Sequence, residues 1–249
     1  MSGHSKWATI KHKKGAADKK RGTLFAKLIK QVEVAARQGG GDPNGNATLR
    51  TMFAKAREAS VPLDTIERAV KRGTGELEGV DYQNVTYEGY APHGVALLVE
   101  CLTDNRNRTG GEVRATFSKN GGSLAEPGAV SWQFTRTGVV YLPRSIDEDT
   151  LMSVVLDAGA EDIVDEGDNW RVTCAPTDLP AVRAALEDAK ITFESAEVTM
   201  LASTSVLLDT EAAAKAVLKL VDLLDDNDDV AGVYGNFDVP EAILHAVAL

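Results

Sequence analysis

Hydrophobic residues recur every three or four positions in three stretches near the amino terminus, a spacing that places them on one face of a helix. The first stretch predicts a helix over about 17–38. The second follows Asn46, a residue well suited to cap a helix. The third is expected to begin at Asp64, whose side chain caps the first turn in a capping box with Glu67, and to end with Gly73 as its C-cap. Together these amphipathic segments predict a small helical bundle.

From about residue 80 the pattern changes to short strand-like runs that alternate with helices. Within 136–204 the predicted order of elements is βαββαβ, the ferredoxin-like arrangement. A helix over 210–224 and a strand over 232–239 then remain, and they are too few to form a domain alone. We expect them to complete the unit that begins near residue 80. The other elements predicted for that unit are strands at 85–88, 95–102 and 130–134 and a helix over 110–119.

The predicted fold class is therefore multi-domain α and α+β, with an N-terminal three-helix bundle followed by two α+β (ferredoxin-like) domains, one inserted in the other. The predicted domains are a basic helical domain with an N-terminal arm (1–75), a discontinuous α+β domain (80–135 plus 205–240) and an inserted ferredoxin-like domain (136–204).

Charge divides the chain in the same way. Residues 1–72 hold 16 Lys and Arg against 6 Asp and Glu, a net +10, whereas the other 177 residues hold 11 against 31, a net −20. Such an asymmetry is typical of proteins that contact nucleic acid or membranes, because cations displace the counterions condensed on phosphates. A charge run is also a common solvated surface, so the sequence leaves both interpretations open. Residues 146–249 hold 23 of these acidic side chains against 5 basic ones, and this part is expected to face solvent, a basic partner protein or the chain's own basic segment.

The basic segment supplies most of the candidate contacts to phosphate. We expect residues before Ala17 to form an arm that orders on phosphate, and Trp7 either to stack on a base or to anchor this arm to the bundle. The predicted nucleic-acid-binding residues of the arm and first helix are Lys6, Trp7, Lys11, His12, Lys13, Lys14, Lys19, Lys20, Arg21 and Lys27.

Two further basic groups are candidates. The second and third helices resemble a helix-turn-helix pair, in which Arg68, Lys71 and Arg72 would face a groove of DNA. In the segment 103–109, Arg106 and Arg108 precede a helix that Thr109 is expected to cap, which predicts an anion site. The alternative for this segment is that the arginines pair with nearby acids.

The sequence offers little sign of catalysis. No phosphate loop, zinc-protease helix or nucleophile elbow is present, and the four histidines lack ligand spacing. We expect no enzyme activity, no cofactor and no metal, and we interpret the run 225–229 as a solvated helix end rather than a calcium loop. With two isolated cysteines, no leader and no long apolar run, the expected location is the cytoplasm.

Several segments together resemble the YebC/PmpR family. They are the opening Gly3-His4-Ser5-Lys6-Trp7-Ala8 with the Lys-rich stretch to Arg21, then Gly41-Asp42-Pro43, Tyr87-Glu88-Gly89-Tyr90-Ala91-Pro92-His93-Gly94 and Thr103-Asp104-Asn105-Arg106-Asn107-Arg108-Thr109. The resemblance implies a bacterial regulator with a helical domain and two α+β domains. Members are usually described as probable DNA-binding transcriptional regulators, and relatives include translation factors that help ribosomes through proline-rich sequences.

Two functional hypotheses follow, and the sequence does not decide between them. One is a probable DNA-binding transcriptional regulator, and the other is a ribosome-associated translation factor that binds ribosomal RNA. A protein-interaction scaffold is a third, less favoured class. The expected partner is nucleic acid, with no membrane contact, and the oligomeric state is left open with a monomer allowed.

Overall fold

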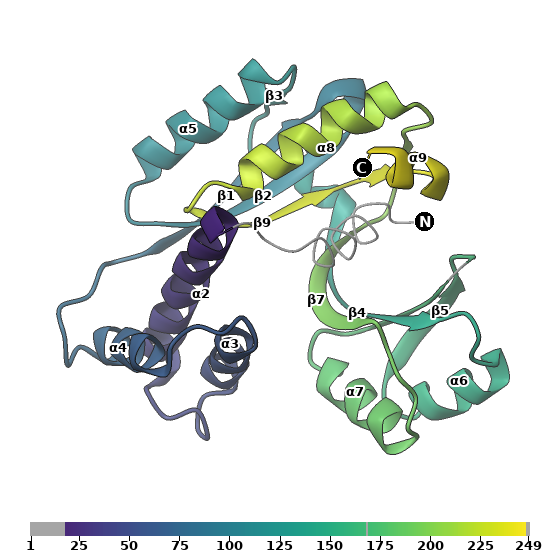
Figure 1. Ribbon diagram of the computed structural model, residues 1–249, viewed down its shortest axis with the longest axis horizontal. Coiled ribbons are helices and arrows are strands. Elements are labelled where there is room, and N and C mark those ends of the chain that lie inside the picture. The colour runs from purple at the N-terminus through teal and green to yellow at the C-terminus, as the bar shows by residue number, and fades with distance from the viewer. Residues whose placement is uncertain (1–17, 168, 248–249) are drawn as a thin grey trace. The chain divides into compact units, whose positions relative to one another are not determined.

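The computed structural model describes residues 18–167 and 169–247 (Figure 1). Two compact units are present within these ranges. One contains residues 132–207 and 236–238, and the other contains the remaining described residues.

The larger unit begins with a bundle built on α2 (Asp18–Gly39), against which α3 (Ala47–Glu58) and α4 (Leu63–Thr74) both pack. Its core includes Val32 of α2, Leu49 of α3 and Ile66 of α4, none of which is exposed. The side chain of Asn46 caps α3 by accepting a hydrogen bond from the N–H of Leu49 at 3.0 Å, so this prediction is confirmed.

The predicted ends of α4 are wrong. Pro62 occupies the N-cap position without a side-chain hydrogen bond, and the C-cap is Gly75, which adopts φ 84°. Gly73 instead lies buried inside the helix, where a Cβ atom would stand 2.3 Å from the backbone oxygen of Glu33. A glycine does cap the end of α4, but it is Gly75 rather than Gly73. Gly73 instead allows α4 to approach α2 closely.

The same unit contains a four-stranded antiparallel sheet in the order β3-β1-β2-β9, covered on one face by two helices that lie side by side (Figure 1). The helix and strand from the end of the chain complete this sheet domain, as the sequence predicted. A short C-terminal helix, α9, was not predicted. The strands are β1 (Gln83–Tyr90), β2 (Ala96–Thr103), β3 (Ser123–Leu124) and β9 (Val230–Gly235), and the helices are α5 (Arg106–Lys119), α8 (Glu211–Asp225) and α9 (Glu241–Val247), with the turn η1 (Pro92–Gly94) between β1 and β2.

The strand predicted at 130–134 does not form, and the buried carboxylate of Glu88 explains why. It accepts hydrogen bonds of 2.7–2.8 Å from the N–H groups of Gly128, Val130 and Ser131. This segment therefore curls around Glu88 and continues into the short helix η2 (Ser131–Gln133) instead of pairing in a ladder. Burial alone would raise the pKa of Glu88, but the three backbone donors hold it below its usual value.

The smaller unit has the predicted βαββαβ order, with strands arranged β5-β6-β4-β7 and two helices packed on one face. Trp170, which is almost completely buried, lies in this core and donates a hydrogen bond to the backbone oxygen of Ile146. The fold class of a helical bundle followed by two α+β domains is thus confirmed. The elements are β4 (Phe134–Pro143), α6 (Glu148–Val155), β5 (Ala160–Asp165), β6 (Asn169–Cys174), α7 (Leu179–Asp188) and β7 (Ser195–Ala202), with a parallel pair of β8 (Val206–Leu207) and β10 (Phe237–Asp238).

Candidate nucleic-acid interface

The predicted residues of the basic arm fall mostly outside the part of the chain that the structure describes. Those residues are Lys6, Trp7, Lys11, His12, Lys13 and Lys14. Lys19, Lys20 and Arg21 lie in the first turn of α2. Their role in binding nucleic acid stays a prediction.

Lys27, another predicted contact, faces the interior of the larger unit together with Lys30. The ammonium group of Lys27 donates to the backbone oxygen of Asp225 and, at 3.2 Å, to its carboxylate. Lys30 donates to the backbone oxygen of Asp228 at 3.0 Å and to the carboxylate of Asp229 at 2.8 Å. The two lysine side chains are only 11% and 19% exposed. They therefore connect α2 to the segment between α8 and β9, and the acidic part of the chain here contacts its own basic segment, one of the three expected arrangements.

Arg72 is also engaged within the protein. Its Nε donates to the carboxylate of Glu33 at 2.8 Å, and Glu33 is 1% exposed in the middle of α2. The same carboxylate accepts from the N–H of Val80 at 3.1 Å. Arg72 thus helps to hold α4 and the following linker against α2.

The exposed face of α4 carries acids as well as the predicted bases. Arg68 lies 3.8 Å from Asp64 in an exposed ion pair, and the exposed Lys71 shares this face with Glu67. Because α3 and α4 pack on α2 and touch each other little, they lack the mutual packing expected of a helix-turn-helix pair. The structure therefore gives no support for α4 as a helix that reads bases.

The segment 103–109 is arranged differently from the prediction. The N-cap of α5 is Asn105, whose side chain accepts from the N–H of Arg108 at 3.1 Å. Thr109, predicted as the cap, is fully buried one turn into the helix. The helix begins earlier than predicted because Asn105, rather than Thr109, satisfies the first free N–H groups.

This earlier start separates the two predicted arginines. Arg108 donates to Asp104 at 2.8 Å and to the buried carboxylate of Asp229 at 2.6 Å. Thr103 and Thr109 also donate to Asp229, at 3.1 and 2.8 Å. We refer to Asp229 with its donors Lys30, Thr103, Arg108 and Thr109 as the Asp229 cluster. Here the alternative interpretation, that an arginine of this segment pairs with nearby acids, is correct.

The Asp229 cluster is an electrostatically coupled anchor. Asp229 is 5% exposed, so the expectation of a solvated run at 225–229 is wrong at this position. Burial alone would raise the pKa of Asp229, but hydrogen bonds from Lys30, Arg108 and Thr109 hold the pKa far below its usual value. The same carboxylate and that of Asp104 raise the pKa of Arg108. The cluster ties α2, the start of α5 and the start of β9 together.

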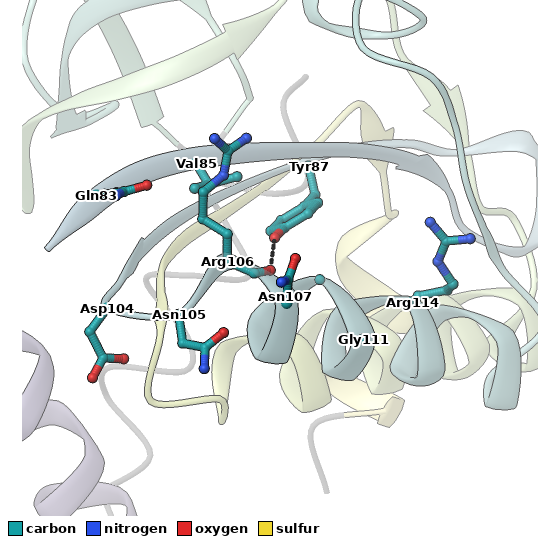
Figure 2. A pocket seen from close by; sticks show the side chains of 10 residues that line it. Gln83, Val85, Tyr87, Asp104, Asn105, Arg106, Asn107, Gly111 and Arg114 are labelled. Carbon is teal, nitrogen blue, oxygen red and sulfur yellow. Dashed lines mark hydrogen bonds between the residues drawn. The ribbon is translucent and has the colours of Figure 1, made fainter.

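Arg106 lies on the other side of α5, in a depression of about 680 Å³ between that helix and β1. Figure 2 shows its guanidinium extending toward β1, with Arg114 farther along the helix and the ring of Tyr87 between them. The hydroxyl of Tyr87 donates to the backbone oxygen of Arg106 at 3.1 Å. Gly110 and Gly111 form part of the helix surface in the depression. We call this depression the α5 groove.

Sequence reasoning singled out the basic segment 103–109 and Arg114 in the helix after it, but it did not place them beside β1. Tyr87 was predicted only as part of a strand at 85–88, and the pair Gly110-Gly111 gives no signal of its own in a helix. Alternation along 83–87 could have placed Gln83 and Tyr87 on one face of β1. Their position beside α5 depends on how the helix packs on the sheet.

Other chemistry is sparse in the described ranges. Within them, no group of three or more His, Cys, Asp or Glu side chains is placed to hold a metal ion. Cys101 and Cys174 are both buried and form no disulfide. Burial, with a contribution from Asp229, raises the pKa of the Cys101 thiol to about 12. Across residues 18–167 and 169–247, no helix combines the length and the apolar character needed to cross a membrane.

Comparisons with known proteins match the whole arrangement. Residues 5–76 match a family model described as the TACO1/YebC protein N-terminal domain, and residues 82–237 match one described as TACO1/YebC second and third domain.

Similar proteins cover nearly all of the chain. A probable transcriptional regulatory protein of Mycolicibacterium gilvum is 58% identical over 245 residues, which is 98% of this chain and 97% of that protein. One from Thermobifida fusca is 56% identical over 250 residues, covering 100% of both. The crystal structure of a conserved hypothetical protein from Aquifex aeolicus superimposes with a TM-score of 0.75 at 42% identity, covering 89% of this chain and 91% of that one.

Proposed function

Because this chain belongs to the TACO1/YebC family, we propose that it is a cytoplasmic regulator that acts by binding nucleic acid, with duplex DNA as its target, rather than by catalysis. Relatives named probable transcriptional regulatory proteins support regulation at the family level. Binding to DNA is the finer step, and it rests on the physical chemistry of the basic segment.

The observation that carries the proposal is the net +10 of residues 1–72 in a chain of net charge −10. Part of this charge is used inside the protein by Lys27, Lys30 and Arg72. The arm and the first turn of α2 hold seven further Lys and Arg residues, at positions 6, 11, 13, 14, 19, 20 and 21. Cations concentrated in this way bind phosphates by releasing condensed counterions, which makes binding steeply dependent on salt.

The test is a salt titration of binding. Labelled duplex DNA from the organism's own promoters and scrambled duplexes of equal length are titrated with the full chain between 50 and 200 mM salt. A transcriptional regulator should bind its own site about a thousandfold more tightly than a scrambled duplex at fixed salt, since specific binding is commonly stronger than non-specific binding by about 4 kcal/mol or more. Equal affinity for both duplexes at every salt concentration would contradict sequence-selective DNA binding.

Matched variants identify the segment that binds. Lys13→Ala with Lys14→Ala should lower the slope of log affinity against log salt by about 1.8 on duplex DNA, at about 0.9 for each phosphate contact. Lys215→Ala with Lys219→Ala removes the same charge from exposed positions of α8 and should leave the slope unchanged. If both double variants lower the slope equally, DNA binding depends on the net charge of the protein and not on the basic arm.

Ribosomal RNA is a second candidate target, and one observation favours it. The exposed face of α4 mixes Asp64 and Glu67 with Arg68 and Lys71, so it is poorly suited to enter a groove of DNA. Under this alternative the protein is a translation factor that relieves stalling at proline-rich sequences. Co-sedimentation with ribosomes that resists 200 mM salt, together with faster synthesis of a proline-rich reporter, would favour it. Binding to neither DNA nor ribosomes would leave the scaffold hypothesis.

A further inference from the structure

The α5 groove contains two cations that form no ion pair with any described residue. Neither Arg106 nor Arg114 forms an ion pair there, and both are exposed. The acid beside them, Asp104, is already bonded to Arg108 at 2.8 Å. The groove therefore has a net positive charge that the fold does not use.

The spacing of the two arginines suits an extended polyanion better than a single small anion. Arg106 and Arg114 are eight residues apart, which corresponds to a rise of about 12 Å along the helix. Figure 2 shows their guanidinium groups separated along the groove rather than converging on one point. Two cations held apart in this way match two phosphates of one strand, with β1 as the opposite wall.

Gly111 is an independent indication of a ligand. A Cβ atom built on Gly111 meets nothing within 4 Å, so packing does not require glycine at this position. Glycine inside a helix is less favourable than alanine by about 1 kcal/mol. Packing favours glycine at position 110, because a Cβ atom there would come within 3.1 Å of the Tyr87 hydroxyl. No neighbouring atom favours glycine in the same way at position 111. A bare backbone beside two arginines allows a phosphodiester chain to lie close against the helix.

The remaining groups of the groove suit a nucleotide chain. The amides of Gln83 and Asn107 can donate and accept hydrogen bonds to sugars or base edges. The ring of Tyr87 forms part of the wall, and aromatic side chains next to cations are the usual elements of sites for single strands. The site does not depend on the end of α5, because Asn105 already caps that end.

We propose that the α5 groove binds a single-stranded segment of nucleic acid, with one phosphate on Arg106, another on Arg114 and the intervening backbone lying over Gly111. This inference rests on the proposed function and adds to it a second site, remote in sequence from the basic arm. The nucleic acid that the regulator binds would therefore present a single-stranded region to the sheet domain.

The test uses a labelled single-stranded RNA of mixed sequence, titrated with the full chain between 50 and 200 mM salt. Arg106→Ala with Arg114→Ala should lower the slope of log affinity against log salt by about 1.4, because each phosphate contact on a single strand contributes about 0.7. The ratio of wild-type affinity to variant affinity should therefore be about sevenfold smaller at 200 mM salt than at 50 mM salt. The variant Lys215→Ala with Lys219→Ala is the charge-matched control and should match the wild type.

Gly111→Ala and Gly111→Leu test the close approach separately from charge. Affinity for the RNA should fall in the order Gly, Ala, Leu, while the slope with salt stays constant. Hydrogen exchange of α5 should show that the helix remains folded in both variants. Wild-type affinity in Gly111→Leu would overturn the proposed path over Gly111.

The outcomes separate this inference from the proposed function. If the wild type binds nucleic acid and the arginine variant keeps the full slope, the groove proposal is wrong and the proposed function stands. If the wild type binds neither duplex nor single strands, both fail. If the arginine variant loses binding to poly-glutamate but not to RNA, the groove is a site for acidic peptides and the proposal is overturned.

Discussion

The two sides of the first turn of α5 place similar residues in opposite roles. Arg108 enters the Asp229 cluster, whereas Arg106, two residues earlier, lies in the α5 groove without an ion pair to any described residue. Two residues turn a helix by about 200°, so neighbours of this kind point in nearly opposite directions. The comparison teaches that a dense basic motif can serve folding with one arginine and leave another free to bind a ligand.

The difference arises from what each side faces. Asp229 is removed from water by the packing of α2 and α5 around β9, so its charge needs several donors. The groove is open to solvent, where an arginine keeps its hydration without a partner. We therefore expect substitutions in the cluster to change stability and substitutions in the groove to change binding.

The largest expected effect is that of Asp229→Ala. Removal of the carboxylate leaves Lys30 and Arg108 without their shared partner, and we expect a loss of about 2–4 kcal/mol in the free energy of unfolding. Hydrogen exchange of β2 and β9 should accelerate, while exchange of β4 in the smaller unit serves as an internal control. Unchanged protection of β9 would show that the cluster is not an anchor.

The second prediction concerns how the stability contributed by the Asp229 carboxylate depends on pH. The variant Asp229→Asn isolates this contribution, because it removes the charge and keeps the size of the side chain. The pKa of Asp229 is lowered by folding, so its contribution to stability is present above the unfolded value of about 3.9 and is lost as the pH falls below it toward the folded value. The stability difference between wild type and variant should therefore be constant from pH 7 to pH 5 and smaller at pH 3.

Urea unfolding at each pH, followed by circular dichroism, measures this difference. Glu88 also has a lowered pKa, but it is present in both proteins and its effect cancels. A difference that stays constant down to pH 3 would mean that Asp229 is not held ionised by its donors.

Much of the fold could be predicted from the sequence because its elements are strongly periodic. The βαββαβ order and the return of the chain to the first sheet follow from apolar spacing. Exact ends were less predictable where tertiary contacts decide them, as when the buried Glu88 takes the N–H groups of a segment that resembles a strand. Gly73 was mistaken for a C-cap because its contact with the backbone of Glu33 is not local in sequence.

The candidate site was only partly predictable for the same reason. The total charge of the basic segment is a property of the sequence, but its division between structural and free cations is not. Lys27 pairs with Asp225, almost two hundred residues away, and Arg108 pairs with Asp229. No pattern in a single sequence predicts these pairs, whereas the unpaired Arg106 was found because it belongs to the same motif.

The third prediction compares the two arginines directly. Arg108→Ala should lower the free energy of unfolding measurably but by less than Asp229→Ala, because Asp229 keeps its other donors. Arg106→Ala should change it by less than about 0.5 kcal/mol, as is usual for exposed residues without partners. Urea unfolding of both variants, measured beside wild type, tests the contrast. Equal losses would erase the distinction between the two sides of the helix.

The smallest change in stability that should be clearly measurable has the opposite sign and concerns Gly111. If this glycine is kept for a ligand rather than for folding, Gly111→Ala should raise the free energy of unfolding by about 0.5–1 kcal/mol, because alanine favours the helix and meets no neighbour. Gly73→Ala is the matched control and should be destabilising, since its Cβ would press on the backbone oxygen of Glu33. Urea unfolding of the two variants beside wild type measures both changes in the free energy of unfolding, a gain for Gly111→Ala and a loss for Gly73→Ala. A loss of stability in Gly111→Ala would give the glycine a role in folding and remove it from the argument for a bound strand.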